Sequence, residues 1–224
     1  EHAREMRTVV EASEKLINAT FAEVESDLRN LGQNWRDQQE QHDAFSLDLA
    51  YQDLRRFVEF HKMVKSARLI SPEGELWYAT DQSVSQQGQL LTDQASFREF
   101  LNQLGNGPDF NVGQVEYNAS SRVWVIPLRL VLRNAKAQAQ YIVEVQLGAD
   151  FLVAFWKDAP ISRDSAIFLV RDDGRLLSRY PVPSPPFDFA AMYSERRSGT
   201  LVTYIQKNNF PRQGEVSGYS RLLK

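Results

Sequence analysis

The chain has 224 residues, of which 42% are hydrophobic and 25% are charged, a balance typical of a folded globular protein. The formal net charge is -3, so nucleic acid is not expected as a partner, because its binders usually carry a basic stripe. Cysteine is absent, which excludes disulfides and cysteine-ligated metals, and no apolar run approaches the roughly 18 residues of a membrane span.

The first 42 residues predict one long helix, because they are rich in Glu, Arg, Gln and Ala and contain no proline. Apolar residues recur every seven positions in two staggered sets, Val10, Ile17, Val24 and Leu31 in the first and Phe21, Leu28 and Trp35 in the second. Two compatible interpretations follow. The stripe packs on the chain's own modules, or it forms the seam of a parallel dimer that continues a membrane anchor.

A second helix is expected from Leu47 to Val64, with Ser46 as its N-cap. A first module of five strands follows, with a polar loop at 82–93 and a short helix from Ser96 to Leu104 between its second and third strands. The expected strands are 67–71, 75–80, 111–118, 121–132 and 139–147. Short polar links join the last three strands, so neighbours are expected to pair antiparallel in an α+β module.

Residues 149–157 predict a short amphipathic helix that leads into a second module. Its expected elements are a hairpin at 166–180, a proline-rich link at 181–186, a helix at 187–195 and strands at 200–206 and 215–223. Because this module lacks a closing strand, we expect it to be smaller than the first and truncated.

The strongest signal is an internal repeat. SARLISPEGELWYAT at 66–80 and AIFLVRDDGRLLSRY at 166–180 align one hundred positions apart. Each copy has an acidic residue and a glycine, Gly74 or Gly174, between two apolar runs, which predicts a hairpin whose turn needs a positive φ. We expect Asp172-Asp173-Gly174 to be this turn and not a metal loop. The repeat predicts three parts: a helix at 1–46 and two related modules at 47–160 and 161–224.

Several segments resemble the double Cache family, PAS-like extracytoplasmic sensor modules of bacterial receptors. They are SARLISPEGELWYAT, TDQASFREFL at 92–101, RVWVIPLRLV at 122–131, YIVEVQLGADFL at 141–152 and SAIFLVRDDGRLLSRYP at 165–181. The resemblance implies a long N-terminal helix and two Cache modules with antiparallel sheets, membrane-distal at 47–160 and membrane-proximal at 161–224. The last segment resembles sensors attached to GGDEF diguanylate cyclases, while histidine kinases and chemoreceptors share the architecture.

The resemblance also implies a small-molecule pocket in the distal module, between the sheet and the loop and helix that cover it. Tyr117, Arg122 and Trp124 match the spacing of an amino-acid-binding branch. Val125 stands where that branch has a further aromatic, and Gln146 or Glu144 stands where it has an aspartate. A carboxylate or amino-acid-like ligand is therefore expected, with free amino acids as one candidate.

Strand alternation places Arg122, Trp124 and Ile126 on one side of the predicted sheet, where a guanidinium beside an indole can bind a carboxylate bidentately. The remaining candidate lining residues are Arg129, Tyr78, Asp81, Asp93 and Tyr141. Alternatively, Tyr117 and Arg122 lie in solvent at a hairpin tip and Trp124 is ordinary core. Asp93 either forms an acidic-aromatic pair with Phe97 or only caps the following helix.

No catalytic residue or cofactor is expected, because the sequence has no nucleophile motif, P-loop or dinucleotide fingerprint. The three histidines, His2, His42 and His61, show no metal-type spacing among themselves. Together with this absence of catalytic motifs, the resemblance implies a non-catalytic, ligand-sensing periplasmic domain of a membrane-anchored signalling protein, which we expect to be a homodimer through its N-terminal helix. The alternatives are a structural or protein-interaction module without a working pocket, and a soluble hydrolase, for which no convergent nucleophile and base is visible.

Overall fold

The computed structural model describes residues 2–42, 45–81, 88–105, 107–159, 167–170 and 176–180. The expected turn at 172–174 and every element expected beyond Tyr180 lie outside these residues. The chain forms two compact units, one of residues 1–22 with 149–224 and one of residues 23–148. Each unit includes a part of the first helix, whereas the repeat in the sequence predicts that this helix is a separate segment.

Two helices open the chain, α1 at His2–His42 and α2 at Leu47–Phe60. The predicted N-cap is confirmed, because the Ser46 hydroxyl accepts a hydrogen bond from the Leu49 backbone N–H at 3.4 Å. Helix α2 ends earlier than expected, since His61 takes an extended conformation as its C-cap and Val64 already begins the first strand.

The unit of residues 23–148 contains one six-stranded antiparallel sheet with the strand order β2-β1-β6-β5-β3, and β4 also pairs with β5. The strands are β1 (Val64–Ile70), β2 (Leu76–Ala79), β3 (Phe110–Val112), β4 (Glu116–Asn118), β5 (Val123–Arg133) and β6 (Ala139–Gly148). The single strand expected at 111–118 is two strands. Residues 113–115 between them belong to no strand, although the Gly113 backbone N–H still donates to the Pro127 carbonyl of β5 at 2.7 Å. The predicted α+β class and antiparallel pairing are confirmed.

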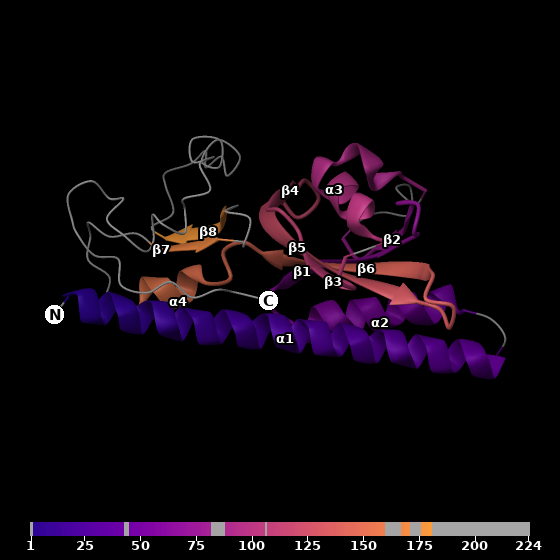
Figure 1. Ribbon diagram of the computed structural model, residues 1–224, viewed down its shortest axis with the longest axis horizontal. Helices are drawn as coiled ribbons and strands as arrows, with labels where there is room; N and C mark the ends of the chain where they lie inside the picture. The colour runs from indigo at the N-terminus through magenta and orange to yellow at the C-terminus, as the bar shows by residue number, and fades with distance from the viewer. Residues whose placement is uncertain are drawn as a thin grey trace. The chain divides into compact units, whose positions relative to one another are not determined.

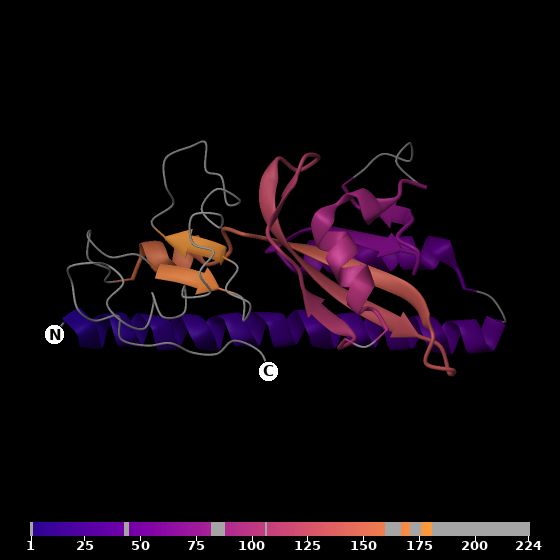
Figure 2. The same ribbon diagram turned by 45° about the horizontal axis from the view of Figure 1, so that its top comes forward.

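Helices cover both faces of this sheet (Figures 1 and 2). The C-terminal part of α1 and helix α2 lie on one face, and the short helices η2 (Leu91–Asp93) and α3 (Ala95–Gln103) lie on the other. Helix α1 comes close to the sheet at Gly32, where an added Cβ would collide with the Leu132 side chain.

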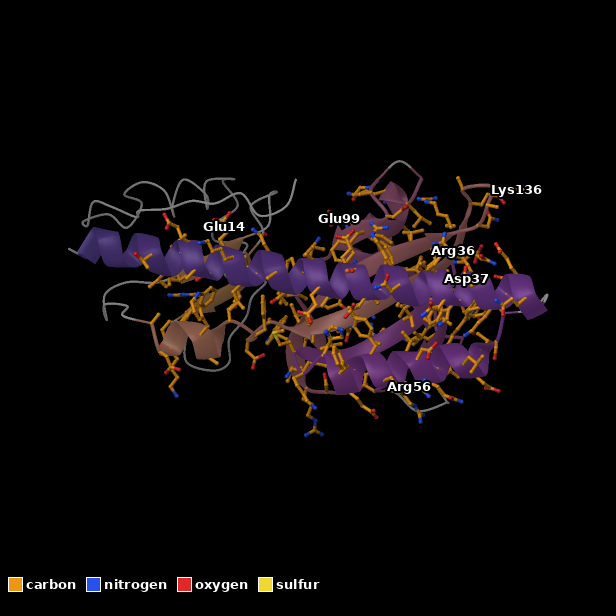
Figure 3. The ribbon with its side chains drawn as sticks, turned by 90° about the horizontal axis from the view of Figure 1, so that it is seen from below. Glu14, Arg36, Asp37, Arg56, Glu99 and Lys136 are labelled. Carbon is orange, nitrogen blue, oxygen red and sulfur yellow. The ribbon has the colours of Figure 1, made fainter. Side chains whose placement is uncertain are left out.

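Most of the apolar stripe of α1 is buried within the chain's own units, as the first interpretation of the heptad pattern expects, while Val10 and Leu31 are partly buried. Its core members are at most 3% exposed: Ile17, Phe21, Val24, Leu28 and Trp35. The Trp35 indole N–H donates to the Asp53 carboxylate of α2 at 3.0 Å. The exposed side of the two helices is charged, with Arg36, Asp37 and Arg56 among its residues (Figure 3).

The other unit contains α4 (Val153–Lys157) and a hairpin of β7 (Ile167–Val170) and β8 (Leu176–Tyr180). Here the N-terminal part of α1 contacts α4 through a hydrogen bond from the Trp156 indole to the Ser13 hydroxyl, 2.8 Å long. The middle of β8 is joined to the segment before α4, because the Ser178 hydroxyl donates to the Ala149 carbonyl at 2.7 Å.

The two repeated hairpins have the same register. Leu69 pairs with Tyr78 and Ile70 with Leu76, so Trp77 is an extra residue that shifts the pairing by one. One hundred positions later, Leu169 pairs with Ser178 and Val170 with Leu176, with the same shift. The repeat seen in the sequence is therefore a repeat of strand pairing and of a bulge-like irregularity at the same place.

Gly74 has φ +93°, as the hairpin pattern predicts, and an added Cβ would lie 3.1 Å from the Phe97 ring. We expect Gly74→Ala to lower the free energy of unfolding by about 1–2 kcal/mol, because a left-handed conformation costs an L-residue this much. Urea unfolding monitored by tryptophan fluorescence measures the change.

Gly105→Ala is the matched control, since a Cβ at that position meets nothing within 4 Å. It should change the stability by less than about 0.5 kcal/mol. Equal effects of the two substitutions would contradict the assigned role of Gly74.

Candidate functional site

The sheet face beneath α3 has an apolar part and a polar part. Phe97 and Phe100 of α3 pack into the apolar part, with residues such as Ile70, Val131 and Ile142 from the strands. The polar part, here called the polar cluster, consists of Ser66, Arg68, Glu116, Asn118, Arg129, Glu144 and Gln146. Six of these residues are buried, and Glu116 is partly buried.

Register and alternation explain why these side chains meet. Arg68 of β1 and Arg129 of β5 are both paired with Glu144 of the central strand β6. Ser66 of β1 and Gln146 of β6 are also paired. Each lies two positions from Arg68 or Glu144 in its strand, so both side chains lie on the same face of the sheet as those residues. Strand geometry thus gathers charged and amide side chains from distant sequence positions.

Glu144 is the centre of the polar cluster. Its carboxylate accepts hydrogen bonds from Arg129 Nε at 2.7 Å, from Arg68 Nη1 at 3.1 Å and from Gln146 Nε2 at 3.1 Å. Complete burial opposes ionisation, but the two guanidinium groups and the hydrogen bonds outweigh it and lower the pKa of Glu144. Glu144 is therefore a buried anion with two cationic partners.

Glu116 connects the polar cluster to α3. Its carboxylate accepts a hydrogen bond from the Ser96 hydroxyl of α3 at 2.7 Å and one from Gln146 Nε2 at 3.2 Å. Burial and then the charge of Glu144 raise the pKa of Glu116, while Arg129, Ser96 and Arg68 act in the opposite direction. The two carboxyl groups thus have pKa values that shift in opposite directions from the ordinary one.

Asn118 closes the end of the polar cluster near the β4–β5 turn. Its side-chain oxygen accepts hydrogen bonds from the backbone N–H groups of Ser120 and Ser121, and its amide nitrogen donates to Gln146 and to the Asp81 carboxylate. The second carboxylate oxygen of Asp81 is buried and has no hydrogen-bond partner among the described residues. Asp81 therefore keeps a buried acceptor atom.

Arg129 is the least satisfied member of the polar cluster. Its side chain is 0% exposed and its Nε is bonded to Glu144, yet neither Nη1 nor Nη2 has a hydrogen-bond partner among the described residues. The guanidinium carbon lies 5.2 Å from the centre of the Phe97 ring and 5.3 Å from that of Phe100. A buried donor without an acceptor is costly, and a guanidinium fork suits a carboxylate, so this group is equipped to bind an anion.

Among the predicted site residues, Arg129 and Asp81 lie in or beside the polar cluster, whereas the motif Tyr117, Arg122 and Trp124 lies at the β4–β5 hairpin. Tyr117 is 52% exposed and contacts the Trp124 ring edge-on at 5.5 Å. The prediction that Arg122 shares a strand face with Trp124 is wrong, because β5 begins at Val123 and Arg122 occupies the preceding turn with φ +57°.

Tyr78 and Tyr141 lie on the opposite face of the sheet, with α1 and α2. Tyr78 stacks on Tyr51 of α2 at 4.1 Å between ring centres, and its hydroxyl accepts a hydrogen bond from Arg55 Nε at 2.7 Å. Tyr141 stacks on Phe45 at 4.3 Å. Neither tyrosine shares a face with Arg129.

Asp93 is exposed at the end of η2, and its backbone carbonyl accepts a hydrogen bond from Arg98. Its expected capping role is not observed, because Gln94 is the N-cap of α3 and makes no side-chain cap. Phe97, its expected aromatic partner, contacts Arg129 instead.

The sequence-based prediction did not include Ser66, Arg68, Glu116 or Asn118, and it considered Glu144 and Gln146 only as replacements for an aspartate. A signal was present in the strands themselves. Arg129 interrupts an otherwise apolar and buried stretch of β5, and Arg68 and Glu144 lie in buried stretches of β1 and β6. An ionised residue in such a place requires a partner of opposite charge.

No family model and no curated protein matches this chain. No helix among the described residues is long and apolar enough to cross a bilayer. Solved structures do match, at low identity, and these matches concern the fold.

One neighbour is the extracellular domain of rpHK1S-Z16, described as a histidine kinase, with 18% identity and a TM-score of 0.64 over 87% of this chain and 77% of that one. Another is an extracellular ligand-binding receptor from Desulfohalobium retbaense, with 13% identity and a TM-score of 0.62 over 85% of this chain and 34% of that one. A third is the ligand-binding domain of the Pseudomonas fluorescens chemoreceptor CtaA in complex with L-valine, with 12% identity and a TM-score of 0.56 over 80% of this chain and 74% of that one. The chain shares the fold of extracellular sensor and ligand-binding domains of histidine kinases and chemoreceptors.

Proposed function

We propose that this chain is the extracytoplasmic sensing domain of a bacterial membrane-anchored signalling protein, and that it binds a small carboxylate or amino-acid-like molecule at the polar cluster. The observation that carries the proposal is Arg129, a wholly buried guanidinium with two terminal nitrogens that lack acceptors among the described residues. We propose a role in binding and not in catalysis, in line with the solved neighbours, which are sensor and ligand-binding domains.

The charges of the polar cluster favour an anion. Arg68 and Arg129 contribute two cations, and Glu144, with its lowered pKa, contributes one anion. Burial raises the pKa of Glu116, which favours its neutral form. At a pH below the folded pKa of Glu116, where this residue is neutral, these four groups have an excess positive charge that a carboxylate ligand would balance.

An amine would find its partner at Asp81, whose buried oxygen lacks a hydrogen-bond partner among the described residues. Asp81 and Arg129 together would bind the two ends of an amino-acid-like ligand, and Phe97 and Phe100 would supply apolar contacts. The solved domain of CtaA is in complex with L-valine in one structure and with L-serine in another, which supports this ligand class by analogy of fold.

The signal would pass through the sheet. A ligand on Arg129 would change its contacts with Phe97 and Glu144, and β6 reaches α1 through the hydrogen bond from Gln140 to Gln39 at 3.2 Å. Differential affinity for two arrangements of this unit would shift their populations, with coupling of about 1–3 kcal/mol. We propose that the protein is a homodimer through α1 and that this population shift changes the contact between the two copies of α1.

For the output, we propose a diguanylate cyclase domain, otherwise a histidine kinase or a chemoreceptor. The support for the cyclase is the resemblance of SAIFLVRDDGRLLSRYP to sensors attached to GGDEF domains. The sequence of the parent gene on either side of this chain tests the proposal, which requires hydrophobic spans and a cytoplasmic signalling domain.

A panel of amino acids and small carboxylic acids should contain a compound that raises the melting temperature, because a ligand that binds only the folded state stabilises it. We expect Arg129→Lys to weaken binding of that compound by about tenfold or more, since lysine keeps the charge but loses the bidentate fork. Isothermal titration calorimetry measures the affinity, and circular dichroism confirms folding.

Arg122→Ala is the matched control, because Arg122 lies in an exposed turn. It should bind as tightly as wild type if the polar cluster is the site. Asp81→Asn should weaken ligands that carry an amine and spare simple carboxylates. Loss of binding in Arg122→Ala alone would move the site to the hairpin, and a panel without any hit would favour a structural or interaction module.

The raised pKa of Glu116 predicts a pH dependence of stability. Such a carboxyl group stabilises the fold fully below its unfolded pKa, and this contribution is lost as pH rises through the folded pKa, above the ordinary value of 4.5. The stability of wild type relative to Glu116→Gln should therefore fall as pH rises from 4.5 through the folded pKa of Glu116. Melting temperatures of both proteins across this range measure the trend.

Glu73→Gln is the control for a solvated carboxyl group, because Glu73 is exposed. It measures how the loss of one exposed carboxylate changes the melting temperature over the same pH range. A stability difference between wild type and Glu116→Gln that does not change with pH would contradict the raised pKa of Glu116.

A further inference from the structure

Three side chains with metal-ligand chemistry converge where α1 meets the end of α2. Glu23 and Asp27 are four residues apart on α1 and so share one face of that helix, and His61 follows the last residue of α2. One ligand atom from each lies within 4.8 Å of the others. None of the three belongs to the polar cluster.

His61 is held in place by its surroundings. Its backbone N–H donates to the Phe57 carbonyl at 3.0 Å, and its own carbonyl accepts from Val64 at 2.9 Å. The ring packs at 4.3 Å from the Phe57 ring and 5.2 Å from the Phe60 ring, and the residue is 7% exposed. Its Nε2 lies 3.0 Å from the Asp27 carboxylate. The imidazole is therefore oriented toward α1 before any ligand binds.

The two carboxylates remain accessible. The Asp27 side chain is 39% exposed, Glu23 is exposed, and no ion pair of Glu23 occurs among the described residues. Like charges at this helical spacing repel each other by about 0.2–0.5 kcal/mol. The pairing of His61 with Asp27 leaves Glu23 without a cationic partner, whereas a divalent cation would neutralise both carboxylates.

We propose that Glu23, Asp27 and His61 bind a divalent first-row transition ion of the Zn²⁺ type. An imidazole with two carboxylates suits Zn²⁺, while Mg²⁺ and Ca²⁺ prefer oxygen ligands alone. Bonds of about 2.0–2.2 Å bring tetrahedral ligand atoms to about 3.3 Å from one another, so the exposed Glu23 side chain must move inward. Three protein ligands leave a fourth position for water.

The bound ion would link two elements of the unit of residues 23–148. His61 lies three residues before β1, and Glu23 and Asp27 lie on α1. Metal occupancy would thus fasten the long helix to the first strand of the sheet, which gives the domain a second input independent of the polar cluster.

Titration of the whole chain with ZnCl₂ by isothermal calorimetry tests the proposal. We expect one tight Zn²⁺ ion per chain, an increase in melting temperature, and no competition from excess Mg²⁺. Glu23→Gln, Asp27→Asn and His61→Gln should each weaken Zn²⁺ binding by about tenfold or more, which corresponds to about 1.4 kcal/mol or more.

Two controls isolate the site. Asp37→Asn removes another exposed carboxylate of α1 and should leave the affinity unchanged, as should the double variant His2→Gln and His42→Gln. Arg129→Lys should also retain Zn²⁺, which separates this proposal from the ligand site.

His61→Gln removes a packed ring and is the variant with the greatest risk of misfolding. Glu23→Gln is the decisive variant, because Glu23 is exposed to solvent and its substitution should not disturb the fold. Wild-type affinity in folded Glu23→Gln would overturn the three-ligand site. Absence of Zn²⁺ binding to the wild-type chain, or its loss in the double histidine variant, would overturn it as well.

Discussion

The buried carboxylate of Glu144, held between Arg68 and Arg129, is the interaction on which the unit of residues 23–148 depends. It joins the three central strands β1, β6 and β5 at one level, and burial of these charges is tolerated only because each has a partner. In the same arrangement Nε of Arg129 binds Glu144, and its two terminal nitrogens have no hydrogen-bond partner among the described residues, so they can bind a ligand. Structural support and ligand recognition thus share one side chain.

Local patterns in the sequence predicted much of the fold. The absence of proline and the apolar stripe predicted α1, Ser46 predicted the start of α2, and the acidic-glycine turn predicted the first hairpin. Tyr78, a predicted lining residue of the pocket, lies on the opposite face of the sheet, and the bulge explains why. Two residues after Leu76, Tyr78 would share its face, but Trp77 is inserted in the pairing and turns Tyr78 to the other side.

Contacts between distant positions lay beyond local patterns. Glu116 belongs to a strand of three residues, which is too short for a periodic signal. Arg122 adopts a positive φ, which an arginine at that position does not predict. The histidines show no metal-type spacing among themselves, and the partners of His61 lie more than thirty positions earlier, on another helix. Which donors of Arg129 are satisfied depends on rotamers and packing, which periodicity does not encode.

Gly32 limits the ways in which α1 can transmit a change. A side chain at this position would collide with Leu132, so the helix fits against the sheet there only through a bare backbone. A displacement of one helical turn along its axis would bring Leu28 or Arg36 opposite Leu132, and neither fits without repacking. Piston-like sliding is thereby disfavoured, and tilting or rotation about the glycine contact is the motion that this packing permits.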